Sequence, residues 1–245
     1  MRVALISDIH GNLVALETVL STIDKDDVDQ ILCLGDVAAT GPQPHAVSAR
    51  LQAVGCPVVM GNADEWLLDP RFSETIDETT RKIEEVDSWC ALQLTRNDLV
   101  YMHTFQPQIE CRLGENAKLL CFHGSPRSNV EIIEVTTPEV SLEQMFVGAC
   151  ALVMAGGHTH VQMLRRYREG FILNPGSVGL PFESKRFSEE PYNPPWAEYA
   201  LVTWQNSGLS IELKRVPVEI DAIKRAILGS GMPLAELWAR DWRKS

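Results

Sequence analysis

The stretch that decides the fold is residues 3–12, which read VALISDIHGN. A short apolar run stops at a carboxylate, an imidazole and a glycine, which is typical of a buried parallel strand ending in a tight turn. Asp8 and His10 are two residues apart, so an extended chain would point both side chains to the same side. A carboxylate oxygen beside an imidazole nitrogen suits a divalent transition metal. The pair alone is weak evidence, and the rest of the chain has to support it.

The length and composition indicate a globular protein. A chain of 245 residues suffices for one large domain, and we expect a single domain over residues 1–245 with a helical cap insertion over residues 64–98. The hydrophobic fraction of 45% and the charged fraction of 22% are ordinary for a soluble protein. No apolar run approaches the roughly 18 residues that span a bilayer, and no signal peptide precedes the first strand. We therefore expect a cytoplasmic protein without a membrane partner.

The charge and the cysteines exclude further classes. The net charge of −11 argues against broad nucleic-acid binding, which needs a basic surface. It does not exclude a phosphorylated substrate, because bound metal ions can outweigh the negative field locally. The six cysteines have no paired spacing and several lie in apolar runs, so we predict buried reduced thiols in preference to disulfides or a zinc cluster. They are Cys33, Cys56, Cys90, Cys111, Cys121 and Cys150.

The first sixty residues alternate between buried strands and helices. Helical spacing of apolar residues predicts helices over 12–23 and 45–54. Apolar runs predict strands at residues 3–6, 30–34 and 56–60, each followed by glycine or an acidic residue within a few positions. This β-α-β-α-β order is typical of a layered sheet with helices on its faces.

The rest of the chain is more mixed. Residues 63–99 carry apolar side chains at near-helical intervals, which predicts two or three helices beside the sheet. We expect the last predicted helix to pack onto the domain rather than to form a dimer interface. The sequence leaves the oligomeric state open. Further predicted elements are antiparallel strands over 99–113, buried strands over 118–122 and 151–155, a helix over 138–149, hairpins over 161–173 and 199–216, an exposed loop over 181–195, and helices from about residue 221.

Five predicted strands end in side chains that bind metals. In open α/β sheets, ligands bind outside the carboxyl ends of the strands. One ion takes about four to six ligands, so seven ligands predict two divalent ions that share one carboxylate. The seven are Asp8, His10, Asp36, Asn62, His123, His158 and His160.

Each of these residues alone has a structural explanation. Asp36 could cap a helix, Asn62 could occupy a turn, and His123 could be a structural histidine. Their recurrence at equivalent positions favours the metal site. His45 and His103 follow no such pattern, and we predict that neither is a ligand.

Together the motifs resemble the calcineurin-like metallophosphoesterase superfamily, and its small prokaryotic phosphodiesterase branch in particular. The motifs are SDIHGN at 7–12, GD at 35–36 with GP at 41–42, GN at 61–62, HG at 123–124 and GHTH at 157–160. The resemblance implies an α/β protein with a four-layer α/β/β/α sandwich and a small helical cap. It also implies two ions of manganese, iron, zinc or nickel, one held by Asp8, His10, Asp36 and His160 and the other by Asp36, Asn62, His123 and His158.

The resemblance further implies a di-metal phosphoesterase, and we expect a phosphodiesterase acting on a small phosphorylated substrate. Two ions roughly 3.5–4 Å apart lower the pKa of a bridging water and clamp the phosphoryl oxygens for in-line attack. Asp36 would hold that bridging water. Asn12 could bind the substrate phosphate or could cap the following helix. Residues 174–177 could support the site from a neighbouring turn.

One position departs from the family pattern. Many relatives carry a histidine after Gly-Asn, which is thought to protonate the leaving group, whereas this chain has Ala63. General acid help is worth about 10²- to 10⁴-fold, so we expect a preference for acidic leaving groups. His103 or a cap residue could supply the missing proton. A phosphomonoesterase (a nucleotidase, a protein phosphatase or a dinucleoside polyphosphate hydrolase) and a non-catalytic scaffold like the retromer subunit remain alternatives, although the seven ligands argue against the scaffold.

Overall fold

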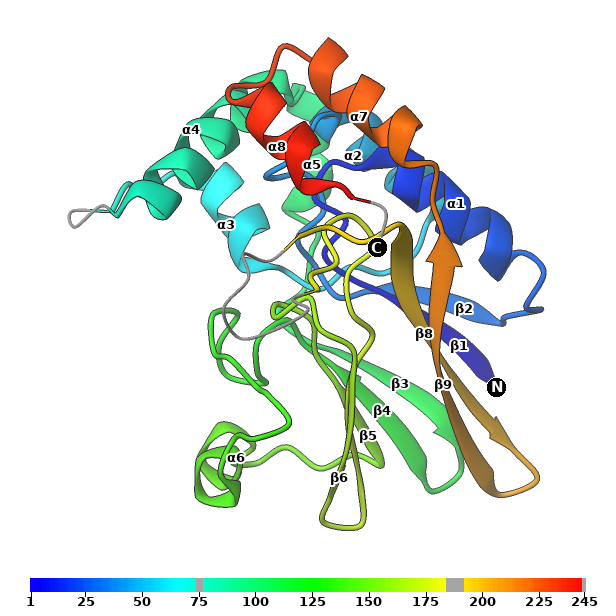
Figure 1. Cartoon of the computed structure of the whole chain (residues 1–245). Helices are drawn as coiled ribbons and strands as arrows, with labels where there is room; N and C mark the ends of the chain where they lie inside the picture. Colours follow the sequence, from blue (N-terminus) through cyan, green and yellow to red (C-terminus); the bar gives the residue numbers. More distant parts are fainter. Residues whose placement is uncertain (74–76, 184–191, 244–245) are drawn as a thin grey trace.

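The computed structural model describes residues 1–73, 77–183 and 192–243, and these residues form two sheets flanked by helices (Figure 1). The first sheet has the order β2 (Gln30–Cys33), β1 (Arg2–Ile6), β8 (Trp196–Gln205) and β9 (Gly208–Pro217). The second has the order β3 (Ile109–Gly114), β4 (Ala117–Cys121), β5 (Val153–Ala155), β7 (Gly170–Asn174) and β6 (Met163–Tyr167).

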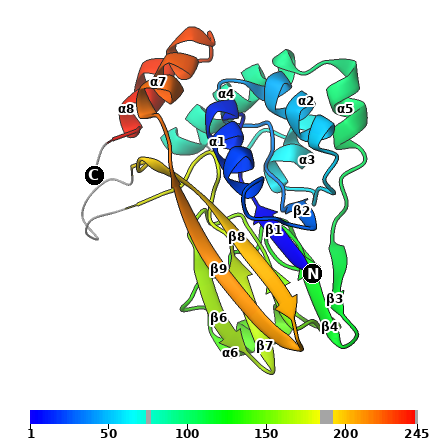
Figure 2. The same cartoon turned by 90° about the vertical axis from the view of Figure 1, so that its right-hand side faces the viewer.

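Helices cover the outer faces of both sheets. A single helix, α6 (Glu139–Met145), lies beside the second sheet (Figure 1). Helices α7 (Ile220–Gly229) and α8 (Ala235–Asp241) follow the long β8–β9 hairpin, as Figure 2 shows. The helices over the first sheet are α1 (Leu13–Ile23), α2 (Pro44–Val54), α3 (Asn62–Leu68), α4 (Glu78–Gln93), α5 (Arg96–Met102), α7 (Ile220–Gly229) and α8 (Ala235–Asp241).

The alternation of side chains along the strands produces three apolar interfaces within the described residues. In β1, Ala4 and Ile6 pack against the helices, whereas Val3 and Leu5 pack against the second sheet. In the second sheet, Leu120 faces outward into a cluster that is closed by residues of α6. Successive residues of a strand point to opposite faces, so one strand serves two interfaces. Three interfaces separate four layers, which confirms the predicted α/β/β/α sandwich.

The parallel strands meet at one edge. Strand β1 is parallel to β2, and β4, β5 and β7 are parallel in the second sheet. The carboxyl ends of β1 and β2 and those of β4 and β5 are therefore where the predicted ligands leave the sheets.

Two predicted segments fold differently. Residues 99–102, the expected start of the strands over 99–113, form instead the end of α5, which begins in a capping box: the Thr95 side chain accepts from the Asp98 N–H, and Asp98 accepts from the Thr95 N–H and hydroxyl. The expected strand over 56–60 makes only isolated bridges, between Cys33 and Val58 and between Val59 and Gln106.

The expected exposed loop over 181–195 is only partly exposed where it is described: Phe182 is exposed, Pro181 and residues 192–194 are buried, and residues 184–191 lie outside the described residues. Asn193 donates to the carbonyl of Pro181 at 3.0 Å and forms a bridge with Trp242. Trp242 is 1% exposed, so the chain directly after α8 packs onto the domain. The backbone of Asn193 pairs with this part of the chain: its N–H donates to the carbonyl of Asp241 at 2.9 Å, and its carbonyl accepts from the N–H of Arg243 at 3.0 Å.

Helices α3, α4 and α5 overlap the predicted cap insertion, and they share one hydrophobic cluster with α1 and α2. The division of the chain into a domain and a cap stays a prediction. All six cysteines are free thiols, five of them buried and Cys150 exposed. Within the described part of the chain, no helix has the length and apolar character needed to cross a membrane.

Candidate metal centre

The seven predicted ligands converge on one site. One ligand atom each from Asp8, His10, Asp36 and His160 lies within 4.8 Å of the others, and the same holds for Asp36, His123 and His158. The side-chain oxygen Oδ1 of Asn62 lies 3.0 Å from Nε2 of His123, so Asn62 adjoins the second group. Asp36 belongs to both groups. With Asn62 included, the two groups contain the same residues as the two ligand sets that the family resemblance implies, with Asp36 in both, and their binding of metal stays a prediction.

The backbone brings the ligands together in a way that the sequence did not indicate. Residues 8–10 do not stay extended, so the reason given for the convergence of Asp8 and His10 is wrong. The left-handed region costs a non-glycine residue roughly 1–2 kcal/mol, and such strain gathers at functional sites. Five of the seven ligands have positive φ, at 53° (Asp8), 45° (His10), 54° (Asp36), 69° (His158) and 58° (His160).

Hydrogen bonds between the loops after β1 and β2 hold this strained backbone. The N–H of Asp8 donates to Gly35 at 2.9 Å, and the N–H of His10 donates to Asp36 at 3.0 Å. The N–H of Gly11 donates to Val37 at 3.0 Å. Each loop therefore satisfies the backbone groups of the other, which compensates for the unusual dihedral angles.

Two glycines allow the chain to approach the carboxylates closely. A Cβ atom at Gly61 would lie 2.1 Å from Oδ1 of Asp36, and one at Gly157 would lie 2.6 Å from Oδ2 of Asp8. Neither distance is possible between non-bonded atoms, so these positions require glycine.

Three of the four imidazoles are oriented by backbone carbonyls. Nδ1 of His10 donates to Ala39 at 3.1 Å, Nδ1 of His123 to Leu34 at 2.7 Å and Nδ1 of His160 to Leu180 at 2.7 Å. A carbonyl only accepts, so Nδ1 carries the proton in each ring and Nε2 is directed at the cluster. This arrangement is typical of histidines that bind a metal through Nε2.

The electrostatics of the cluster favour positive charge between the carboxylates. Burial opposes the charged form of His123, but Asp36 raises its pKa to about 10. Burial also opposes the charge of Asp36, and His123 holds the pKa of that carboxyl well below its usual range. Burial and the neighbouring His160 lower the pKa of His10 to about 4. A divalent cation would supply the same positive charge in place of protons, so the residues fit a metal.

Asp64 is a part of the site that the sequence analysis missed. Its carboxylate accepts from the N–H groups of Asp36 at 2.7 Å, Val37 at 2.8 Å and Gly61 at 3.3 Å, and it is fully buried. Asp64 thereby fixes the backbone that presents Asp36. The spacing of Gly61 and Asp64, three residues apart at the start of a helix, was the available signal.

Replacement of Asp64 by alanine is expected to lower the free energy of unfolding by about 3 kcal/mol, because three backbone N–H groups lose their acceptor. Urea denaturation followed by circular dichroism measures the change. Glu65→Ala, at the exposed neighbouring position, is the control and should stay within about 0.5 kcal/mol of the unmodified protein. An Asp64→Ala protein as stable as this control would show that Asp64 does not fix the loop.

The other candidate residues lie around the cluster. Asn12 caps α1 by accepting from the Ala15 N–H at 3.1 Å and donates to Gly179 at 3.1 Å, which favours the capping alternative. Asn174 donates to the carbonyl of Gly157 at 2.7 Å, and Ser177 donates to the carbonyl of Asp8 at 2.7 Å. Both therefore brace loops that carry ligands, in line with the expected supporting turn.

The two remaining histidines are not joined to the cluster. His45 pairs through Nδ1 with Asp98 at 2.8 Å. His103 is exposed at the end of α5, and among the described residues no hydrogen bond or ion pair connects its side chain with the ligands. The structure adds no support for His103 as a proton donor, and that role stays a prediction.

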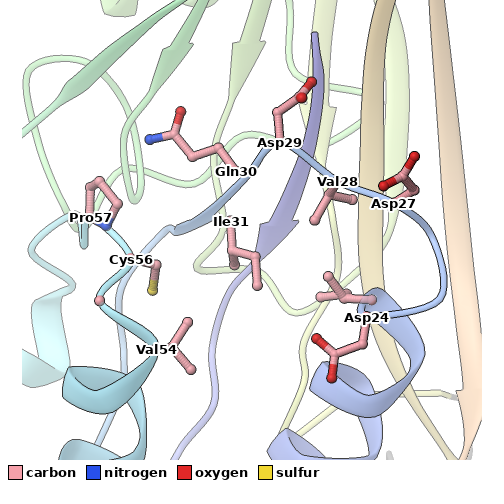
Figure 3. A pocket seen from close by; sticks show the side chains of 11 residues that line it. Asp24, Asp27, Val28, Asp29, Gln30, Ile31, Val54, Cys56 and Pro57 are labelled. Carbon is pink, nitrogen blue, oxygen red and sulfur yellow. The ribbon is translucent and has the colours of Figure 1, made fainter.

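A separate pocket lies at the amino-terminal end of β2, away from the candidate metal centre (Figure 3). It has a volume of about 560 Å³ and is lined by carboxylates that include Asp24, Asp27 and Asp29. No histidine lines it, and Asp29 accepts from the N–H of Arg2 at 2.6 Å. This pocket is therefore not part of the metal centre.

Comparison with known proteins agrees with the geometry. The family model of the calcineurin-like phosphoesterase superfamily domain matches residues 1–191. An uncharacterized protein of Methanocaldococcus jannaschii is 27% identical, with 94% of this chain and 93% of that one covered. The phosphodiesterase YfcE of Escherichia coli is 26% identical over 74% of this chain and 81% of its own length.

The crystal structure of a metallophosphoesterase from Sphaerobacter thermophilus is similar throughout. Its TM-score is 0.73, its sequence identity is 25%, and the match covers 98% of each chain. The family match spans most of the chain and includes the ends of all the strands that carry ligands. This protein belongs to the calcineurin-like phosphoesterase superfamily and is a phosphoric ester hydrolase.

Proposed function

We propose that this protein is a phosphodiesterase that depends on two divalent metal ions and hydrolyses a small phosphorylated substrate. The observation that carries the proposal is the position of Asp36, whose carboxylate belongs to both ligand groups. A shared carboxylate is the arrangement that holds two ions at the short separation needed for phosphoryl transfer. The similarity to a relative named as a phosphodiesterase supports diesters over monoesters.

The donor set indicates which residues hold each ion. Asp8, His10, Asp36 and His160 would hold one, and Asp36, Asn62, His123 and His158 the other. Mixed imidazole and oxygen donors suit manganese, iron, zinc or nickel. When bound, such a pair lowers the pKa of a water molecule and stabilises the phosphoryl oxygens during in-line displacement.

The burial of the ligands indicates the side from which the substrate approaches. Asn62 and His158 are half-buried, whereas the other five ligands are buried. The second group of ligands therefore faces solvent, and the substrate phosphate enters there.

Residues beside the two ligand groups set the preference for the leaving group. Ala63 offers no side-chain proton, and its N–H donates to Asp36 at 2.9 Å. Phe182 stacks on the ring of His160 with 4.9 Å between centroids and is 46% exposed, so it offers a surface for an aromatic group. Both features favour aryl or nucleotide-like esters, whose leaving groups need little help from an acid.

Hydrolysis of a bis-aryl phosphodiester and of the matching aryl monoester tests the proposal, with added manganese, nickel or chelator. We expect cleavage that requires the metal and prefers the diester, with chelation lowering the rate by at least about 100-fold, since metal ions contribute several kcal/mol of transition-state stabilisation. A preference for the monoester would show a phosphomonoesterase. An absence of turnover with two ions bound would show a scaffold.

A further inference from the structure

Helix α4 is connected with the ligand His10 through one buried hydrogen bond. The hydroxyl of Thr40 donates to Oδ1 of Asp87 on α4 at 2.7 Å. Thr40 directly follows Ala39, whose carbonyl accepts from Nδ1 of His10 at 3.1 Å. Thr40 and Asp87 are 7% and 6% exposed, so water does not compete for this bond. The path from α4 to the imidazole therefore contains only Thr40 and the neighbouring peptide.

The backbone at Thr40 is strained. Its φ is 59°, in the left-handed region, which is a genuine outlier for a β-branched residue. Such a conformation persists only where the surroundings enforce it. Asp87 holds the Thr40 side chain, and the thiol of Cys90, one turn further along α4, lies 3.4 Å from the carbonyl of Gly41. Helix α4 therefore contacts the loop at Thr40 and at the following residue, Gly41.

The burial of the Asp87 carboxylate costs free energy of folding. Among the described residues, no lysine, arginine or histidine pairs with it, and a buried carboxylate without a cation destabilises a fold. Burial raises the pKa of Asp87 to about 7, and the charges of Asp36 and Glu84 act in the same direction. Hydrogen bonding from Thr40 acts in the opposite direction and lowers this pKa, because a carboxylate accepts more strongly than a neutral carboxyl group. Both forms keep an oxygen that can accept from the Thr40 hydroxyl.

We propose that Asp87 is a positioning residue for His10: by holding Thr40 it places the Ala39 carbonyl, which fixes the imidazole with Nε2 directed at the metal cluster. This inference rests on the proposed function, because it takes His10 as a metal ligand. Residues that orient metal-bound histidines act through the affinity of the metal, and their loss typically costs about 10- to 100-fold.

Three variants separate positioning from general stability. Asp87→Leu removes the acceptor at a similar volume, and Asp87→Asn keeps an acceptor oxygen. Val86→Ala loosens the packing of the same helix, because Val86 is fully buried, and it leaves both partners of the Thr40–Asp87 hydrogen bond in place. Titration with Mn²⁺, followed by the electron paramagnetic resonance of the free ion, measures the number and affinity of the sites. We expect Asp87→Leu to weaken one site about 10- to 100-fold, and Asp87→Asn and Val86→Ala to stay within about threefold of the unmodified protein.

A second readout needs no metal and no activity. Long-range proton–nitrogen NMR of protein kept in chelator reports which nitrogen of His10 carries the proton. The unmodified protein and Asp87→Asn should show a single tautomer with the proton on Nδ1, whereas Asp87→Leu should show a mixture. If Asp87→Leu does not fold, Thr40→Val and Thr40→Ser provide the same comparison, since only serine keeps the hydroxyl.

The outcomes are distinct. Equal affinity and an unchanged tautomer in Asp87→Leu would overturn the inference, as would an equal loss in Val86→Ala or in Asp87→Asn. If the unmodified protein bound no Mn²⁺, the proposed function would fail. The tautomer measurement would still decide whether Asp87 positions His10.

Discussion

Asp36→Asn is expected to lower kcat/KM for the diester by about 10³-fold or more and to remove one of the two bound metal ions. Asparagine tolerates the left-handed φ of 54° and keeps an oxygen for the Ala63 N–H, so the fold should persist. The variant loses the negative charge that both ligand groups share, and each 1.36 kcal/mol of lost stabilisation lowers the rate tenfold. Steady-state kinetics together with metal analysis of the dialysed protein measures both effects.

The control is Asp27→Asn. Asp27 also has a positive φ, at 51°, but it is exposed and lines the pocket at the amino-terminal end of β2. Its replacement makes the same chemical change in the same backbone conformation, and both rate and metal content should stay unchanged. An Asp36→Asn protein with two ions and the rate of the unmodified protein would contradict the bridging role of Asp36.

Gly61→Ala is expected to reduce kcat by about 10²-fold with a smaller effect on the fold. The added methyl would lie 2.1 Å from Oδ1 and 2.3 Å from the backbone nitrogen of Asp36, so the shared carboxylate has to move. A displacement of about 1 Å in a catalytic site costs on the order of 10²-fold. Overpacking of this kind also costs about 1–3 kcal/mol of unfolding free energy. Kinetics and urea denaturation on the same preparation separate the two effects.

Gly229→Ala makes the same substitution where a Cβ meets nothing within 4 Å. Gly229 ends α7, and alanine there should leave kcat unchanged and stabilise the protein by up to about 1 kcal/mol. If Gly61→Ala behaved like Gly229→Ala, the carboxylate of Asp36 would have room that the structure does not show, and the account of the shared ligand would be wrong.

The sequence alone indicated the candidate ligands and the layered fold. Each ligand follows a short apolar run, and the apolar pattern of β1 or β4 depends on neighbouring residues in the chain. A local capping signal at Thr95 and Asp98 was also present but was not used, and a strand was predicted from residue 99, where α5 continues to Met102. These features can be read from sequence because their causes lie within a few residues.

The tertiary structure decided how the ligands are held. The left-handed backbone at Asp8 and His10 depends on hydrogen bonds to the loop after β2, and the carbonyl that orients His123 belongs to Leu34, 89 residues away. Asp87 accepts a hydrogen bond from Thr40, which lies 47 residues earlier in the chain. No pattern in the sequence encodes such contacts, because they arise only when the two sheets and the helices over them have packed and have brought the carboxyl ends of the strands to a common edge.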